Sequence, residues 1–278
     1  MNKIFKTILP FTALICAVPA AQAATSDGKT WAVSAGWLHV MPQGKKQGVY
    51  GTITDKSPVL KNTPAASPNA GFEVQDADTA GLMLDYFVND HVSLELVLGA
   101  PPEMKLSGKG QITIPPIFGS TPITAANLEK FDTVATTDAY TPTLLAKYHF
   151  GAINNRLRPY VGGGVMYAHF SNVTADPNIN TELNSDSTLK LLKPELGKIE
   201  VDDAFAPVVI AGLDFNINKD WFATASVSYA HLSTTAKLNV IGNTQIIGAN
   251  IPRDTILEGR SKIEINPIVT YLGIGYRF

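Results

Sequence analysis

Hydrophobic and polar residues alternate with a period of two along most of the chain. In residues 91–98 every second residue is Val or Leu, and Ser93 and Glu95 occupy positions between them. Because successive side chains of a β-strand point to opposite faces, this alternation predicts strands rather than helices. The same pattern predicts eight strands, at residues 31–41, 77–88, 91–100, 140–150, 158–170, 205–216, 221–232 and 263–278.

The lengths of the connections between these strands predict how they are arranged. Three connections are short (89–90, 151–157 and 217–220), and four are long (42–76, 101–139, 171–204 and 233–262). Short and long connections alternate strictly, which in an up-and-down barrel puts all short turns at one end and all long loops at the other. Outer-membrane barrels have this asymmetry. A soluble β-sandwich, whose strands usually have about five or six residues, gives no reason for it.

The predicted fold is therefore all-β: an eight-stranded antiparallel up-and-down transmembrane β-barrel with short periplasmic turns and four long extracellular loops. Aromatic residues support it, since Tyr and Trp favour both membrane interfaces. Aromatic residues favour strands in general, but here they gather near the strand ends. Those near the short connections are Trp31, Tyr86, Tyr148, Phe150, Phe215, Trp221, Tyr276 and Phe278, and those near the long ones are Trp37, Tyr140, Tyr167 and Tyr229.

The N-terminus has the pattern of an export signal. Lys3 and Lys6 precede an apolar run, and Ala21-Gln22-Ala23 fits a small-residue cleavage site. We predict a signal peptide at residues 1–23 and a mature outer-membrane barrel at residues 24–278. A lipoprotein signal ending before Cys16 fits poorly, because Ile15 stands where a small residue is required. Cys16 is the only cysteine, so no internal disulfide is expected.

Composition narrows the class of protein further. Charged residues make up 17% of the chain, below the roughly 25% of typical globular domains. A formal net charge of −2 provides no strongly basic surface for nucleic acid. After the signal, no stretch approaches the ~18 apolar residues of a membrane-spanning helix. An exported soluble protein or a barrel of a Gram-negative bacterium remains, and the connection pattern favours the barrel.

Several segments make the chain resemble the OmpW family of small outer-membrane barrels. They are Gly-Ala-Pro-Pro after the third strand, Arg-Pro-Tyr-Val-Gly-Gly-Gly at 158–164, Asn-Lys-Asp-Trp at 218–221 and Gly-Tyr-Arg-Phe at 275–278. The four long connections depart from the family pattern, being longer and less charged. The resemblance implies a narrow apolar lumen and uptake of small hydrophobic compounds. The terminal Phe278 looks like the signal read by the outer-membrane assembly machinery.

Strand parity predicts which side chains point into the barrel. Inward charged residues lie near the short connections: Asp85, Glu95, Lys147, Arg158, Asp214 and Arg277. Above them the inward residues are apolar: Leu38, Val40, Met83, Val97, Leu145, Met166, Val208, Ile210 and Leu232. We predict an apolar upper lumen above a charged periplasmic plug. The charges either only stabilise the barrel or also block water, since opposite charges pair in a low-dielectric interior. Eight strands enclose little more than their own side chains or one small ligand.

The second and fourth long connections are also apolar, with Ile112, Ile114 and Phe118 in one and Ile246 and Ile247 in the other. These residues either pack on one another or form an apolar funnel above the lumen. The partners expected from this arrangement are small hydrophobic solutes, together with the lipid and lipopolysaccharide of the outer membrane.

No catalytic motif of the metalloprotease, serine-hydrolase or P-loop type is present in the sequence. His39, His169 and His231 lie near the long-loop ends of their strands, where a lipid-modifying barrel enzyme could use a histidine. Strand parity turns all three outward, so they are not expected to converge on a catalytic or metal site. The sequence therefore predicts no enzyme, no cofactor and no metal.

The function predicted from these features is passive uptake of hydrophobic molecules with lateral release into the membrane. Pro101 and Pro102, at the upper end of the third strand, lack the N–H groups that strand pairing requires. They either open a side exit or simply end the strand. Pro142 and Pro267 are weaker candidates for the exit. The alternatives are a non-transporting surface barrel for adhesion, recognition or stress protection, and a lipid-modifying enzyme.

Overall fold

The computed structural model describes residues 25–117, 119–248 and 250–278, so the predicted signal peptide lies outside it. Eight antiparallel strands form a closed barrel, because β11 pairs with β6 on one side and with β12 on the other. In order around the wall they are β11 (Thr143–His149), β6 (Val92–Gly99), β5 (Ala77–Phe87), β1 (Trp31–Met41), β18 (Ile268–Arg277), β15 (Trp221–Ala230), β14 (Ala204–Asn216) and β12 (Leu157–Ala175). The predicted fold class is confirmed.

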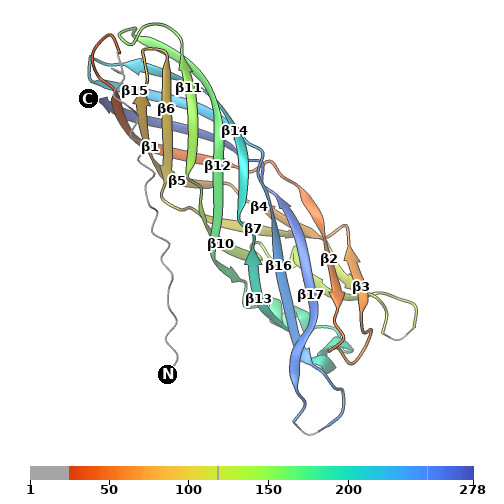
Figure 1. The fold of residues 1–278 in the computed structure, drawn as a ribbon. Helices are drawn as coiled ribbons and strands as arrows, with labels where there is room; N and C mark the ends of the chain where they lie inside the picture. The colour runs from red at the N-terminus through yellow and green to blue at the C-terminus, as the bar shows by residue number, and fades with distance from the viewer. Residues whose placement is uncertain (1–24, 118, 249) are drawn as a thin grey trace, which may run out of the picture.

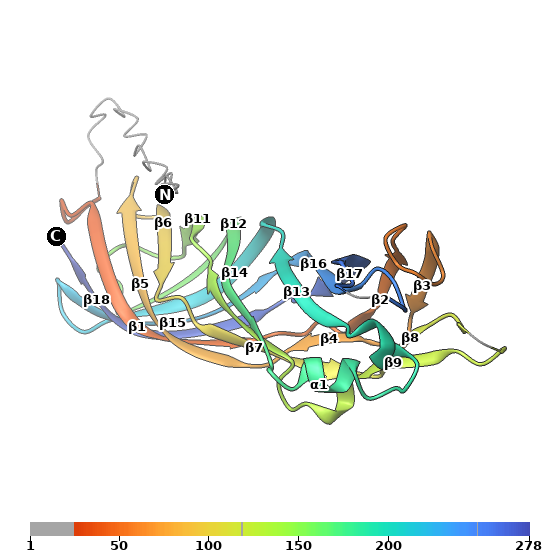
Figure 2. The same ribbon diagram turned by 90° about the horizontal axis from the view of Figure 1, so that it is seen from below.

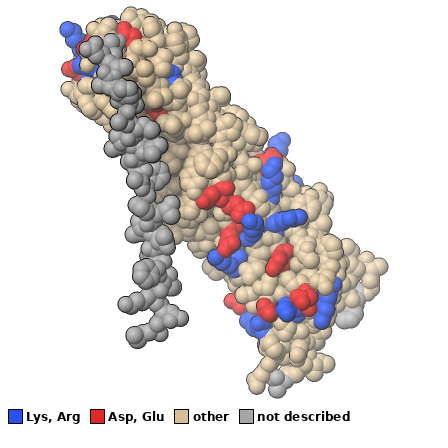
Figure 3. Space-filling view, in the orientation of Figure 1, with Lys and Arg blue, Asp and Glu red and all other residues tan. Residues whose placement is uncertain are grey.

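The alternation of the sequence is visible in the burial of each barrel strand. Along β5, Leu82 and Leu84 are exposed on the outer face, whereas Met83 and Asp85 are buried inside. The same alternation on neighbouring strands gives an apolar outer wall, as a lipid-facing surface requires. On the face shown in Figure 3, charged side chains gather at the periplasmic end and over the extracellular part, and the wall between them is almost uncharged.

The four long connections differ from the irregular loops that the sequence predicts. They continue the barrel outward as an extracellular β-extension, which makes the molecule elongated (Figures 1 and 2). One of its layers joins the upper part of β12 to β10 (Ala135–Tyr140), β7 (Glu103–Lys109) and β4 (Gly71–Val74). The other contains β13 (Glu195–Val201), β16 (Ser233–Asn243), β17 (Arg253–Glu264), β2 (Lys46–Ile53) and β3 (Thr63–Ser67).

The alternation of hydrophobic and polar residues does not reveal the strands of the extension, and the reason is physical. Register shifts interrupt its ladders, for example between Leu196 and Ile199 and between Val240 and Ile241. A bulge adds a residue to one strand and so breaks the period-two pattern. The remaining elements are the hairpin β8 (Gln111–Ile114) and β9 (Ile123–Asn127), helix α1 (Ile179–Leu183), and the 3-10 helices η1 (Leu128–Lys130) and η2 (Leu189–Leu192).

The strand predicted at 158–170 continues to Ala175. Two other predicted strands are interrupted, and a proline lies at each interruption. The predicted strand at 140–150 is divided, since β10 ends at Tyr140, β11 begins at Thr143, and Pro142 lies between. The predicted strand at 263–278 is divided between β17 and β18 around Pro267. Proline has no N–H for the ladder, so each strand is interrupted where the barrel passes into the extension. Among the described residues, no helix is long and apolar enough to cross a membrane.

Candidate functional site

A continuous apolar cavity runs from the upper half of the barrel into the extension. The structure places all nine apolar residues predicted from strand parity on its wall. Leu38, Met83 and Tyr271 pack together on one side of the lumen, and Leu145, Met166 and Ile210 belong to the main core cluster. Eight strands contribute inward side chains at this level, so no single segment forms the cavity.

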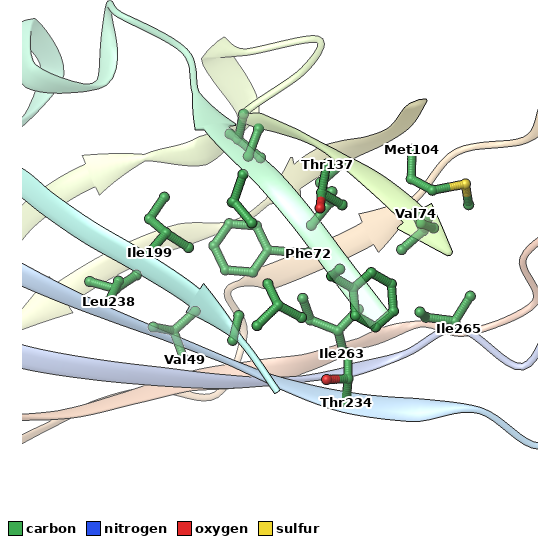
Figure 4. A pocket seen from close by; sticks show the side chains of 18 of the residues that line it. Val49, Phe72, Val74, Met104, Thr137, Ile199, Thr234, Leu238, Ile263 and Ile265 are labelled. Carbon is green, nitrogen blue, oxygen red and sulfur yellow. The ribbon is translucent and has the colours of Figure 1, made fainter. Parts of the chain in front are cut away.

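The extracellular layers form the upper part of the same wall. Figure 4 shows Phe72, Val49 and Ile199 pointing towards one another across the space, with Ile263 and Ile265 further along. The cavity has a volume of about 280 Å³, just below the roughly 300–1,000 Å³ of ligand pockets. Among the described residues that line it, none is charged. The chemistry of this wall suits an uncharged, largely apolar molecule.

The apolar residues of the long connections fall into two groups. Ile112 and Ile114 line the cavity, so this connection both packs against its neighbours and contributes to the wall. Ile246 and Ile247 are exposed on the fourth connection instead. Phe118 lies outside the described residues.

A layer of hydroxyl groups lies below the apolar part of the lumen. Tyr271 donates a hydrogen bond of 3.1 Å to Ser34, and Tyr160 lies 3.4 Å from the hydroxyl of Thr224. The Tyr271 hydroxyl lies over Gly273 on the same strand, where any Cβ atom would clash with it. Glycine is therefore required here for the tyrosine to lie against the wall.

An ionic layer lies beneath the hydroxyl groups. All six predicted charged residues are buried. The ammonium of Lys147 lies 2.6 Å from a carboxylate oxygen of both Asp85 and Glu95. On the other side of the lumen, Asp214 lies 3.6 Å from Arg277, which also donates a hydrogen bond of 2.8 Å to Asn216. This part of the lumen therefore holds charges of opposite sign that pair across neighbouring strands.

Arg158 differs from the expected pairing. Among the described residues, no carboxylate lies within 4.0 Å of its guanidinium, which instead donates to the backbone carbonyl of Asp90 and lies over the Phe87 ring. Ile153, from the short connection after β11, is buried against Phe87 and Phe222. This periplasmic turn thus adds an apolar cluster next to the ionic layer, which the sequence pattern did not predict.

Three further residues, which the sequence analysis did not single out, face the lumen. His149 is fully buried and forms a hydrogen bond of 2.9 Å with Ser93. Ser226 and Ser228 line the cavity from β15. Strand parity is sufficient to place all three inside. His149, for example, lies two positions after Lys147 on the same strand and therefore on the same face. They have neither the apolar side chains nor the full charges that mark the other lumen residues.

The barrel wall has an interruption beside the cavity. Pairing between β6 and β11 ends at Val97 and Thr143, and β7 pairs with β10 only from Glu103. Between these points the amide of Ala139 donates to the carbonyl of Pro102. Residues on both edges of the interruption line the cavity, namely Gly99, Ala100, Pro102, Ala139, Thr141 and Thr143. Pro101 lies in the same segment and is exposed.

The three histidines near the long connections all lie on the outer surface. His39 forms a hydrogen bond of 2.8 Å with Asp78, and His169 forms one of 2.8 Å with Asp203. His231 is exposed. No cluster of three metal-binding side chains occurs among residues 25–117, 119–248 and 250–278. The strands that carry or precede these histidines are not neighbours, since β18 lies between β1 and β15 and β14 lies between β15 and β12.

Comparison with known proteins gives consistent matches over nearly the whole chain. A family model described as the OmpW family matches residues 33–278. Outer membrane protein W of Vibrio cholerae is 28% identical over 198 residues, which are 71% of this chain and 72% of that protein. The dibenzothiophene metabolism operon protein PahQ of Pseudomonas aeruginosa is 23% identical over 250 residues, 90% and 92% of the two chains. The crystal structure of OprG from Pseudomonas aeruginosa has the same fold, with a TM-score of 0.63, 19% identity and coverage of 90% and 96%.

Proposed function

Because the chain belongs to the OmpW family of outer-membrane proteins, we propose that it admits small hydrophobic molecules passively across the outer membrane. The observation that carries this proposal is the cavity that joins the extracellular extension to the upper lumen, whose lining has no charged side chain in the part of the chain that the structure describes. A solute that moves from water into this space gains roughly 25 cal/mol for each Å² of apolar surface buried. No energy source is required for such uptake.

The same geometry favours release through the side of the barrel. Below the cavity, the solute would have to displace the pairs that Lys147 forms with Asp85 and Glu95, and separating buried charges is costly. The interruption between β6 and β11 borders the cavity directly. We propose that the solute leaves there, past Pro101 and Pro102, into the membrane where an apolar molecule is already stable.

A relative supports the chemical class. PahQ is named for an operon of dibenzothiophene metabolism, and dibenzothiophene is an apolar aromatic compound. From this relative we take only the chemical class of the solute proposed for this chain, which is a compact, uncharged and hydrocarbon-like molecule. The proposal assigns no catalytic step, cofactor or nucleic-acid partner. The membrane partners would be outer-membrane lipid and lipopolysaccharide on the outer wall, and the assembly machinery at Phe278, whose side chain is exposed.

The proposal is tested by uptake of n-octane into intact cells with a normal lipopolysaccharide layer, with and without the chain. Expression of the wild-type barrel should raise the initial rate. Ile210→Trp fills the lumen and should remove most of the increase, because Ile210 lines the cavity. Val209→Trp is the matched control, since Val209 is the next residue and faces outward with 59% exposure. Equal rates for cells with and without the chain would refute the proposed function.

A further inference from the structure

Ser226 and Ser228 of β15, and Thr141 at the interruption of the wall, line the cavity without a side-chain hydrogen bond in the described part of the chain. The other hydroxyl groups in the barrel part of the cavity are engaged. Thr79 donates to the carbonyl of Ala100, Thr143 to that of Thr141, and Tyr271 to Ser34. Both serines of β15 are partly exposed to the interior space. Their hydroxyl groups are therefore available to a molecule in the cavity.

The position of the serines marks the lower limit of the apolar space. Ser228 is paired across the sheet with Ile210 and Val269, which are both on the apolar wall. Ser226, one step lower on the same face, is paired with Tyr271, which belongs to the hydroxyl layer. A solute that fills the apolar cavity from above would bring its lower end to these two side chains.

We propose that Ser226 and Ser228 bind the single uncharged polar group of an otherwise apolar solute, such as an alcohol, ketone or aldehyde, and orient it with its polar end down. This inference rests on the proposed function and deepens it. A serine hydroxyl both donates and accepts, so it serves carbonyl and hydroxyl groups alike. In an apolar site, a few polar groups set the orientation of the ligand. Without such a partner, the polar group of the solute would lose its hydrogen bonds to water and gain none in the cavity.

The surroundings of the serines exclude a charged head group. No charged side chain lines the cavity within the described residues. In the layer below, the ammonium of Lys147 is already held by two carboxylates. A carboxylate or ammonium on the solute would therefore be desolvated without a counter-charge, which is far more costly than burying a neutral hydroxyl.

The test compares three probes of equal chain length in intact cells: n-octane, 1-octanol and octanoate. The variant Ser226→Ala/Ser228→Ala should lower uptake of 1-octanol about two- to tenfold, the effect of losing one net hydrogen bond, and leave n-octane unchanged. Octanoate should not gain from the barrel in any variant. Thr137→Val is the matched control, because Thr137 lines the same cavity but its hydroxyl already bonds the carbonyl of Ser171. It should leave the ratio of 1-octanol to n-octane uptake unchanged.

Two further measurements separate the possible failures. Ser228→Thr keeps the hydroxyl and should retain 1-octanol uptake, which excludes a folding defect as the cause of the loss. In lipid nanodiscs, 1-octanol should shift the backbone amide signals of Ser226 and Ser228, and n-octane should not. Equal losses for both probes in the double variant, or no loss for 1-octanol, would overturn the inference. If the wild-type barrel raised uptake of neither probe but these amides still shifted, the proposed function would fail and the binding site would stand.

Discussion

Lys147 and Glu95 form a hydrogen-bonded ion pair of 2.6 Å inside the barrel, and both side chains are almost completely buried. The same ammonium lies 2.6 Å from Asp85. Replacement of the shared cation in Lys147→Met would leave two carboxylates side by side without compensation. We expect this variant to lose about 3–5 kcal/mol of unfolding free energy, as for other broken buried pairs, measured by urea unfolding of the refolded barrel in detergent.

The control for this prediction is the variant that removes the repulsion. Glu95→Gln combined with Lys147→Met leaves one buried carboxylate instead of two, so the double variant should be more stable than Lys147→Met alone. The conductance of planar bilayers should rise for Lys147→Met if the ionic layer also blocks water. If Lys147→Met had the same unfolding free energy and the same conductance as the wild type, the ionic layer would neither stabilise the barrel nor block water.

Cysteine labelling tests the orientation of the chain in the membrane. Cys16 is the only cysteine and belongs to the predicted signal peptide, so a single introduced cysteine reports on its own position. Ser120→Cys lies in the connection between β8 and β9, and Asn218→Cys in the short turn between β14 and β15. On intact cells a membrane-impermeant maleimide should label only the first, and after lysis it should label both. Labelling of Asn218→Cys on intact cells would show that the chain has the opposite orientation in the membrane.

The proposed side exit depends on the two prolines after β6. Pro101→Val/Pro102→Thr restores two N–H donors that could extend the ladder towards β11. We expect slower uptake of n-octane with unchanged surface expression. Pro115→Val/Pro116→Thr is the matched control, because this proline pair lies between β8 and β9, away from the interruption in the wall. Unchanged uptake in a correctly folded Pro101/Pro102 variant would rule out an exit at this place.

The contact between Ser26 and Asp90 should be lost in acid. Burial acts to raise the pKa of Asp90, but the amide and hydroxyl of Ser26, each donating at 2.7 Å, lower it below its ordinary value. A lowered pKa means that the contact stabilises the folded state at neutral pH and is lost as the pH falls through the folded-state value. The amide signal of Ser26 should therefore titrate with a midpoint below the ordinary pKa of an Asp side chain.

Asp90→Asn provides the comparison for this titration. Asparagine keeps the shape of the side chain and has no charge, so the Ser26 amide should show no transition in the acid range. Its protection from hydrogen exchange at neutral pH should also be lower than in the wild type. A Ser26 titration unaffected by Asp90→Asn would mean that another group holds the N-terminal segment.

The sequence by itself determined the barrel because strand periodicity is a local property. Side chains alternate across a strand regardless of what the strand pairs with, so the alternation alone places Met83 and Asp85 inside and Leu82 and Leu84 outside. The lengths of the connections then determined the up-and-down order. The inward apolar residues and the inward charged residues follow from the same parity, as does the inward position of His149.

Only the tertiary structure decided which inward residues meet and where the long connections go. Lys147, Asp85 and Glu95 come from three strands, and their distances depend on the stagger between strands, which alternation does not encode. The strands of the extension could not be predicted from the sequence, because bulges such as that between Leu196 and Ile199 break the period-two pattern. The apolar contact of Ile153 and the interruption of the wall beside Pro102 depend on how a turn and two strand ends are placed in space, and long-range packing alone sets that placement.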